Sequence, residues 1–389
     1  MVLVLSVGLP VVRPGDPAGV ADALREAAAT GQIMQIQGAG TKAHWGGQYS
    51  TVDVMLDTRR LTGVTEHEPG DLVATVRAGT PLRDLQAVLG LAGQRLALEA
   101  GSADATIGGV LAAGEAGPLR LRYGSGRDLL IGVEFVRADG VIAHSGGKVV
   151  KNVAGYDLGR MLCGSYGTVG VITSATFRLH PIPAAQAWVV CPVSTVADLA
   201  GLVASVQDPS IAPSAVEVYL PATGAGSVVV LLEGSRDGVA VRCAALRARL
   251  GADVGTLAEP PSWWGRYPFG PEDVGLKLAA PVSGLPAAIE TLRRHLGEAM
   301  TACGSAGAGV VYVGAPATVP QADLAAATRA IRERLHGTGG TCVVLAAPPA
   351  TREGLDLWGP IAGLGLMRRI KDQFDPSSRF ASGRFVGGI

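Results

Sequence analysis

The sequence of 389 residues has few charged side chains, few aromatic residues and only five cysteines. Its 33 basic and 33 acidic residues cancel, so the bulk charge gives no reason to expect a nucleic-acid or anionic membrane surface. The cysteines are odd in number and include no CxxC pair, which predicts neither a disulfide framework nor an iron–sulfur site. The six histidines are scattered along the sequence and do not have the spacing of metal ligands, so no metal site is expected.

No stretch of about 18 apolar residues is present, and no basic residue precedes the apolar start MVLVLSVGLP. The sequence therefore predicts a cytoplasmic chain in a reducing compartment, without a transmembrane segment. Glycine (55 residues) and proline (24 residues) are abundant, and 48% of the residues are hydrophobic. This composition is typical of a folded, turn-rich protein, and the length predicts two or three domains.

Strand and helix signals alternate along the first third of the chain. Apolar spacing predicts a helix over residues 15–30 and a strand over Ile33–Gln37. A further helix is expected after Thr80-Pro81, with Thr80 as its N-cap, and a turn is expected at EHEPGD, residues 66–71. Asp139-Gly140 predicts the turn of a β-hairpin.

The pattern changes after Pro181 and Pro183, where the glycine clusters become sparse. From residue 184 a round of strands and helices occurs and is then repeated, which predicts an α+β, ferredoxin-like domain. A basic helix near the end of the sequence is expected to stop at Asp375-Pro376.

A glycine-rich turn follows the strand that ends at Gln37. Gly38-Ala39-Gly40-Thr41-Lys42-Ala43 imitates the G-x-G-x-x-A fingerprint of Rossmann folds, with Asp57 at the position of a ribose ligand. The Rossmann interpretation requires a helix to begin inside the motif, and the adjacent Gly46-Gly47 argue against one. We interpret this segment as a turn that cradles phosphate with its backbone N–H groups; a plain tight turn is the alternative.

Two further glycine clusters offer the same chemistry. Ala103–Gly109 (ADATIGG) adds the Thr106 hydroxyl to a run of N–H groups, although close helix–strand packing would select the same small residues. Gly164–Ile172 (GSYGTVGVI) suits a ribose or a base lying on exposed backbone, or a bulged turn. Three clusters in one domain favour an extended dinucleotide ligand.

Three other groups of residues are less specific. Lys151, Asn152, Tyr156 and Asp157 form a polar cluster that could face a flavin ring, or could be exposed helix caps. Arg120, Arg122 and Arg127 are most simply a solvated basic loop, with phosphate or a partner surface as the alternative. The aromatic segment Trp263–Phe269 could wall a cleft, cover a subunit interface or form ordinary domain core.

The order of these motifs resembles the FAD-binding domain of the vanillyl-alcohol oxidase and p-cresol methylhydroxylase (PCMH) type. GAGTK, DATIGG, KNVAGYDL and GSYGTVGVIT occur in that order, and DQFDPSSRFASGR resembles the closing segment of the family. Within that superfamily the sequence is most similar to the smaller FAD-binding subunit of the bacterial three-subunit glycolate oxidase. The resemblance implies an FAD domain over residues 1–183, an α+β cap domain over 184–345, and a segment 346–389 that returns to the FAD domain.

The resemblance also implies noncovalent FAD, because Thr41 follows Gly40 where covalent relatives attach flavin to a histidine, and His44 is expected to pack in the turn. Catalytic residues are not identified; Tyr156 and Lys151 are the candidates. The expected cofactor-binding residues are Gly38, Ala39, Gly40, Thr41, Lys42, Asp104, Thr106, Gly108, Gly109, Gly114, Arg127, Asp128, Gly164, Ser165, Gly167, Thr168, Gly170 and Ile172.

The function implied is that of an FAD-binding subunit of a glycolate (2-hydroxy acid) oxidase or dehydrogenase. Its expected partners are a larger flavin-containing catalytic subunit and an iron–sulfur subunit, which could hold the chain at the inner face of the membrane. Two alternatives stay open: a self-sufficient FAD-dependent 2-hydroxy acid dehydrogenase, and a structural subunit with a non-catalytic FAD site.

Overall fold

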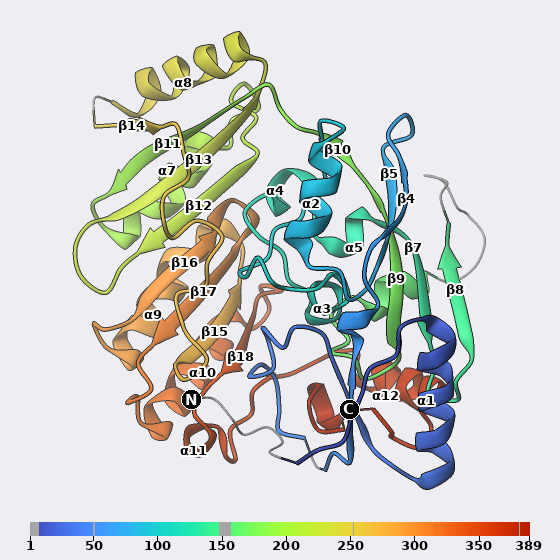
Figure 1. Ribbon diagram of the computed structural model, residues 1–389. Coiled ribbons are helices and arrows are strands. Elements are labelled where there is room, and N and C mark those ends of the chain that lie inside the picture. The colour runs from blue at the N-terminus through green and yellow to red at the C-terminus, as the bar shows by residue number, and fades with distance from the viewer. Residues whose placement is uncertain (1–7, 50, 148–156, 252, 381) are drawn as a thin grey trace. The chain divides into compact units, whose positions relative to one another are not determined.

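The computed structural model describes residues 8–49, 51–147, 157–251, 253–380 and 382–389 (Figure 1). The chain forms two compact units. Unit 1 takes in the described residues of Met1–Ala116, Gly124–Ile182 and Ile361–Ile389. Unit 2 takes in those of Gly117–Tyr123 and Pro183–Pro360. None of the helices in these described ranges is long and apolar enough to cross a membrane.

A small parallel sheet begins unit 1. Its strands are β1 (Val11–Val12), β2 (Met34–Gln37) and β3 (Val54–Asp57), in the order β1-β3-β2. Helix α1 (Pro17–Thr30) packs its buried face on this sheet; Asp16 caps its first turn and Gly31, at φ 76°, ends it. The predicted helix and the predicted strand over Ile33–Gln37 are confirmed.

The second sheet of unit 1 is antiparallel and has five strands in the order β4-β5-β9-β7-β8. They are β4 (Val64–Glu68), β5 (Val73–Arg77), β7 (Leu130–Val136), β8 (Ile142–Gly146) and β9 (Val171–Arg178). The hairpin at Asp139-Gly140 is confirmed, and Gly140 has the positive φ of 74° that such a turn needs. The turn expected over residues 66–71 is too long, since the strand continues to Glu68.

Short helices connect these strands: α2 (Leu82–Gly90), α3 (Ile107–Ala113), α5 (Gly126–Leu129) and α6 (Leu158–Leu162). A two-stranded ribbon pairs β6 (Gln94–Arg95) with β10 (His180–Pro181). Thr80 was expected to cap α2, and this is wrong. Its hydroxyl accepts a hydrogen bond from the Gly63 N–H at 2.9 Å, so a contact 17 residues away takes the group that would have capped the helix.

The closing part of the chain completes unit 1. Helix α12 (Leu364–Phe374) ends at Asp375, as predicted from Asp375-Pro376. The Lys371 ammonium donates to the Asp375 carboxylate at 2.6 Å, to the Thr168 carbonyl at 2.8 Å and to the Phe380 carbonyl at 3.0 Å. These bonds tie the closing segment to the loop before β9.

Unit 2 is built on one antiparallel sheet of eight strands, in the order β14-β11-β13-β12-β16-β17-β15-β18 (Figure 1). The strands are β11 (Ala185–Val193), β12 (Ala215–Leu220), β13 (Gly226–Gly234), β14 (Gly255–Leu257), β15 (Val274–Ala279), β16 (Thr301–Ser305), β17 (Val310–Ala315) and β18 (Thr341–Ala346). The helices are α4 (Arg120–Tyr123), α7 (Leu199–Val206), α8 (Arg236–Leu250), α9 (Leu285–Leu296), α10 (Gln321–Leu335) and α11 (Pro349–Arg352).

The chain order in unit 2 is β-α-β-β-α-β, followed by a second β-α-β-β-α-β. In each half the first strand pairs with the third and the fourth, and the second strand pairs with the third. This is the ferredoxin-like arrangement, which confirms the predicted α+β fold. β12 pairs with β16 and joins the halves into one sheet. One face of the sheet forms a continuous apolar core with the helices.

Candidate functional site

Unit 1 contains a cleft that several distant segments build. The turn after β2, the residue after β3, the start of α3 and the loop before β9 all reach it, together with one side chain from the closing segment. The lining residues are Ile36, Gln37, Gly38, Ala39, Gly40, Thr41, Lys42, Ala43, Thr58, Thr106, Gly108, Gly109, Ala112, Ala113, Tyr166, Gly167, Gly170, Ile172 and Arg384. Eleven of the eighteen expected cofactor-binding residues are among them.

The first glycine turn supplies hydrogen-bond donors to this cleft. No helix begins after β2, as expected for a motif that only imitates the Rossmann fingerprint. The backbone N–H groups of Gly38, Ala39, Gly40 and Thr41 make no hydrogen bond within the described part of the chain. Gly40 has φ 73°, a conformation that side chains rarely adopt. Successive unpaired N–H groups of this kind form a concavity that binds anions.

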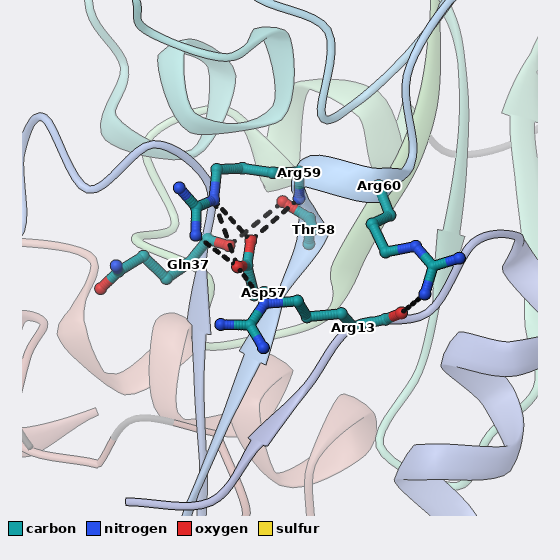
Figure 2. Close-up of polar contacts among 6 residues, drawn as sticks. All are labelled: Arg13, Gln37, Asp57, Thr58, Arg59 and Arg60. Carbon is teal, nitrogen blue, oxygen red and sulfur yellow. Dashed lines mark hydrogen bonds and ion pairs between the residues drawn. The ribbon is translucent and has the colours of Figure 1, made fainter.

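Asp57 is not a ribose ligand, although its spacing imitates one. Its carboxylate, 3% exposed, receives hydrogen bonds from the Arg59 guanidinium at 2.7 Å and the Arg13 guanidinium at 3.2 Å (Figure 2). Burial raises the pKa of Asp57, but the bonds from Arg59 and Arg13 outweigh it and leave the pKa below its ordinary value. The neighbouring Thr58 hydroxyl donates to the Gln37 carbonyl at 3.2 Å, so this cluster fixes one wall of the cleft.

The second glycine cluster lies directly against the first. A Cβ atom on Gly38 would lie 2.1 Å from the Thr106 hydroxyl, so only glycine allows the two loops to approach this closely. The expected run of unpaired N–H groups in the second cluster is wrong at five positions, because the N–H groups of Asp104, Ala105, Ile107, Gly108 and Gly109 all donate within the chain. The Gly108 N–H donates to the Ala78 carbonyl at 2.7 Å, and the Gly109 N–H donates to the Thr106 hydroxyl at 3.3 Å, which caps α3. The Thr106 hydroxyl keeps its own proton for a ligand.

Lys42 lines the cleft as part of a buried ion pair. Its ammonium lies 3.1 Å from the Glu115 carboxylate, and the two side chains are 11% and 1% exposed. Glu115 also accepts a hydrogen bond from the Gly101 N–H at 2.6 Å. The Lys42 ammonium sits 5.2 Å from the centre of the Trp45 ring. Glu115 therefore balances the charge of Lys42 and holds the first glycine turn against the end of α3.

Arg384 is the cationic side chain that sequence reasoning missed. Its guanidinium donates to the Tyr49 hydroxyl and to the Lys42 carbonyl at 2.8 Å, and it lies 5.5 Å from the centre of the Tyr166 ring. Within the described residues it has no carboxylate partner, and its buried Nε has no hydrogen-bond partner. A guanidinium held in this way leaves a positive charge in the cleft. Burial raises the pKa of the Tyr49 hydroxyl, in spite of the nearby Arg384.

The remaining expected residues have other contacts. Asp104 is exposed and pairs with Arg83, and Asp128 accepts hydrogen bonds from Ser125 at the start of α5. Gly114 ends α3 with φ 63°. A second, mainly apolar cavity of about 490 Å³ lies against α12 and includes the expected residues Arg127, Gly164, Ser165 and Thr168. Lys151, Asn152 and Tyr156 lie outside the described residues.

The cleft has the chemistry that an anionic dinucleotide needs. The first turn offers four unpaired N–H donors, the two glycine loops leave no room for side chains between them, and Arg384 adds a positive charge. A diphosphate fits such a donor set. The fold and the cleft thus define a PCMH-type protein that binds a dinucleotide cofactor.

Comparisons with known proteins agree with this class. A family profile described as an FAD binding domain matches residues 9–146. The glycolate oxidase subunit GlcE of Escherichia coli (strain K12) is 41% identical over 155 residues, which cover 39% of this chain and 44% of that protein. The D-lactate dehydrogenase of Archaeoglobus fulgidus is 34% identical over 171 residues, covering 44% of this chain and 38% of that protein.

A match over almost the whole chain is found with an uncharacterized FAD-linked oxidoreductase of Mycobacterium tuberculosis. It is 24% identical over 421 residues, which cover 96% of this chain and 90% of that protein. Among solved structures, alkyldihydroxyacetonephosphate synthase aligns with a TM-score of 0.67 and 16% identity over 95% of this chain and 76% of that one, and this likeness concerns the fold alone.

Residues 9–146 therefore match an FAD binding domain, in agreement with the glycine-lined cleft, and FAD is the cofactor. Over part of its length the chain is similar to glycolate oxidase subunits and D-lactate dehydrogenases. The alignments cover less than half the length of these two relatives.

Proposed function

We propose that the chain is the FAD-binding subunit of a glycolate (2-hydroxy acid) oxidase or dehydrogenase complex. The observation that carries this proposal is the 41% identity to a glycolate oxidase subunit over 155 residues, and the glycine-lined cleft of unit 1 supports it. When bound, FAD supplies the two-electron oxidising chemistry. The residues of this chain bind and orient it: the N–H groups of Gly38–Thr41 receive the diphosphate, and Arg384 adds the balancing charge.

The cofactor is held noncovalently in this proposal. The turn offers Thr41 after Gly40, and His44 is not among the residues that line the cleft. The His44 ring instead lies edge-on to Trp45, with ring centres 6.4 Å apart. Treatment with acid should therefore release all of the flavin from the protein, whereas a flavin-labelled peptide containing His44 would contradict the proposal.

The partners in this proposal are a larger flavin-containing catalytic subunit and an iron–sulfur subunit. Electrons from oxidation of the 2-hydroxy acid pass toward the iron–sulfur subunit, and the complex lies at the inner face of the membrane. The proposal is supported by the relatives that carry the word subunit in their names, glycolate oxidase subunits GlcE and GlcD.

A self-sufficient 2-hydroxy acid dehydrogenase is the second candidate. The 34% identity to a D-lactate dehydrogenase favours it, because that protein is named as a complete enzyme rather than as a subunit. In that case unit 2 would provide the substrate-binding groups that an oxidase of hydroxy acids needs.

One experiment separates these two candidates. The chain is purified alone with its flavin, and glycolate or D-lactate is added without oxygen while the absorbance near ~450 nm is recorded. If the chain alone stays yellow and its flavin is bleached only after the two partner subunits are added, the result supports the proposal that the chain is a subunit. Bleaching of the chain alone supports the self-sufficient dehydrogenase. A colourless protein that takes up no FAD contradicts both.

A further inference from the structure

One face of the unit 2 sheet carries polar side chains, whereas the opposite face packs on helices. Val274, Leu276 and Leu278 of β15 point into the helix-side core, so Lys277 lies on the other face. Strand register places Lys277 beside Tyr312 on β17, and Tyr312 beside Cys303 on β16. Ser305 follows two residues after Cys303 and shares this face.

An aromatic segment, residues 262–270, covers one part of this polar face. Trp263 stacks on Tyr219 of β12 with ring centres 5.0 Å apart, and Tyr267 meets Tyr312 edge-on at 4.7 Å. A Cβ on Gly314, which pairs with Gly275, would lie 1.9 Å from the Pro268 carbonyl oxygen. The segment therefore contacts the sheet two residue pairs from Lys277 and Tyr312, at the next position on the same face. Of the three roles considered for these aromatic residues, packing within the domain is the one observed.

Residues 117–123 cover another part of the same face. Arg120 donates to the Tyr312 hydroxyl at 3.4 Å, and the Tyr123 hydroxyl donates to the Glu233 carboxylate of β13 at 3.1 Å. The expected solvated loop is therefore wrong for Arg120, which is partly buried against β17. Both covering segments thus contact Tyr312, the strand neighbour of Lys277.

Lys277 and Ser305 are the unusual residues of this face. Within the described part of the chain, the Lys277 ammonium has no hydrogen bond or ion pair, and the Ser305 hydroxyl, in a side chain that is 3% exposed overall, has no hydrogen-bond partner. A buried hydroxyl such as that of Ser305, or a half-buried ammonium such as that of Lys277, is costly without partners unless a ligand supplies the missing contacts.

The charges around Lys277 favour an anionic ligand. Arg120 contributes a second positive charge, and burial together with Arg120 lowers the pKa of Lys277 to about 8. Glu217 of β12 is the buried carboxylate on this part of the face, and burial and its charge raise the pKa of Cys303 to about 12. Two cations, Lys277 and Arg120, therefore lie on this part of the face with one carboxylate, Glu217.

We propose that unit 2 binds a small carboxylate at this place, with Lys277 as the ion-pair partner, Arg120 as the second cation, and the Ser305 and Tyr312 hydroxyls as further hydrogen-bonding groups. Cations beside two hydroxyl groups suit a carboxylate with a neighbouring hydroxyl, that is, a small 2-hydroxy acid. This choice of acid rests on the proposed function, whereas the anion site itself rests on the contacts of Lys277 and Ser305.

The test measures binding to the flavin-loaded, full-length protein without turnover. Oxalate, an unreactive analogue of glycolate, is titrated calorimetrically at pH 7 into wild type, Lys277→Met, Lys277→Arg and Arg329→Met. Arg329 is exposed on α10. The Arg329→Met substitution removes a positive charge elsewhere in unit 2 and is therefore the matched control. Lys277→Met should weaken binding about 10-fold or more, Lys277→Arg should stay within about 3-fold, and Arg329→Met should be unchanged.

A second measurement follows Lys277 itself. The chain has five lysines, so ¹³C-methylated lysine signals can be assigned by substitution. Oxalate should raise the pH at which the Lys277 signal titrates. The proposal is overturned if wild type binds no oxalate, if Lys277→Met binds it as wild type does, or if inorganic phosphate binds and oxalate does not. Lys277-dependent oxalate binding in a complex that oxidises no 2-hydroxy acid would contradict the proposed function and leave this inference standing.

Discussion

Replacing Lys371 with methionine should destabilise unit 1 and loosen the cofactor. The Lys371 side chain is 6% exposed and the Asp375 side chain is fully buried. Methionine fills a similar volume but leaves the Asp375 carboxylate without its cation, and it also leaves the Thr168 and Phe380 carbonyls without a donor. Asp375 keeps only the N–H donors of Arg379 and Phe380, each at 2.8 Å.

The magnitude follows from the loss of one partner of a buried ion pair. Such a loss costs about 3–5 kcal/mol, because the remaining charge stays buried. For a domain of this size each kcal/mol lowers the melting temperature by about 2–4 °C, so we expect a decrease of roughly 6–20 °C. The same change releases the closing segment from the loop at Thr168, and Arg384 is carried on that segment. FAD affinity should therefore fall with stability.

Thermal unfolding and flavin release are measured together on the purified holoprotein. Arg369→Met is the control, since Arg369 is exposed on the same helix and should shift the melting temperature by less than about 1 °C. Adding Asp375→Asn to Lys371→Met should recover part of the loss, because it removes the unpaired charge. A Lys371→Met protein that melts and retains flavin like wild type would refute this account of the closing segment.

Four other expectations follow from the structure. Gly38→Ala should lower FAD affinity at least about 10-fold by equilibrium dialysis, since its Cβ would collide with Thr106; unchanged affinity would show that the loops can separate freely. Arg384→Met should weaken FAD binding about 10–100-fold in the same assay, with Arg369→Met unchanged. The folded-state pKa of Asp57 lies below its ordinary value. The stability that the Asp57 carboxylate contributes is therefore present above the ordinary pKa and is lost as the pH falls through the folded-state pKa. Acid unfolding of Asp57→Asn should accordingly depend less on pH below about pH 4. The pKa of Lys277 is lowered to about 8, so the free energy of unfolding of wild type should rise between about pH 8 and 10.5. Lys277→Met should lack this rise, and in urea unfolding at pH 7 it should be more stable than wild type by up to about 3 kcal/mol.

The parts of the fold that the sequence predicted are those with local causes. Asp16 and Gly31 bound α1 because a side-chain cap and a left-handed glycine act within one helical turn. Asp139-Gly140 and Asp375-Pro376 are equally local signals. The repeated ferredoxin-like pattern was predictable because each of its helices and strands buries one face with its own periodicity, although β14 and β16 were too short or too glycine-rich to stand out.

The parts that were missed depend on contacts between distant residues. Arg384 reaches the cleft from more than 300 residues beyond Lys42, whose carbonyl it binds, and nothing in its neighbouring residues indicates that contact. Lys42 was expected to bind the cofactor, and no local feature suggested Glu115 as its partner. Thr80 was expected as a helix cap because that role is local, whereas its actual partner, Gly63, lies across a loop.

The division of unit 1 into three stretches of sequence determines when the cofactor site can form during synthesis. The ribosome makes residues 9–182 first, then the whole of Pro183–Pro360, and only afterwards the closing segment with Lys371 and Arg384. A growing chain therefore leaves unpaired the edge of β2 that later forms a parallel bridge with Phe380, and the cleft lacks its arginine until unit 2 has emerged. Contacts of such long sequence separation form slowly. FAD capture should accordingly be a late step of folding, and a chain released before residue 361 would carry the glycine turns without a completed site.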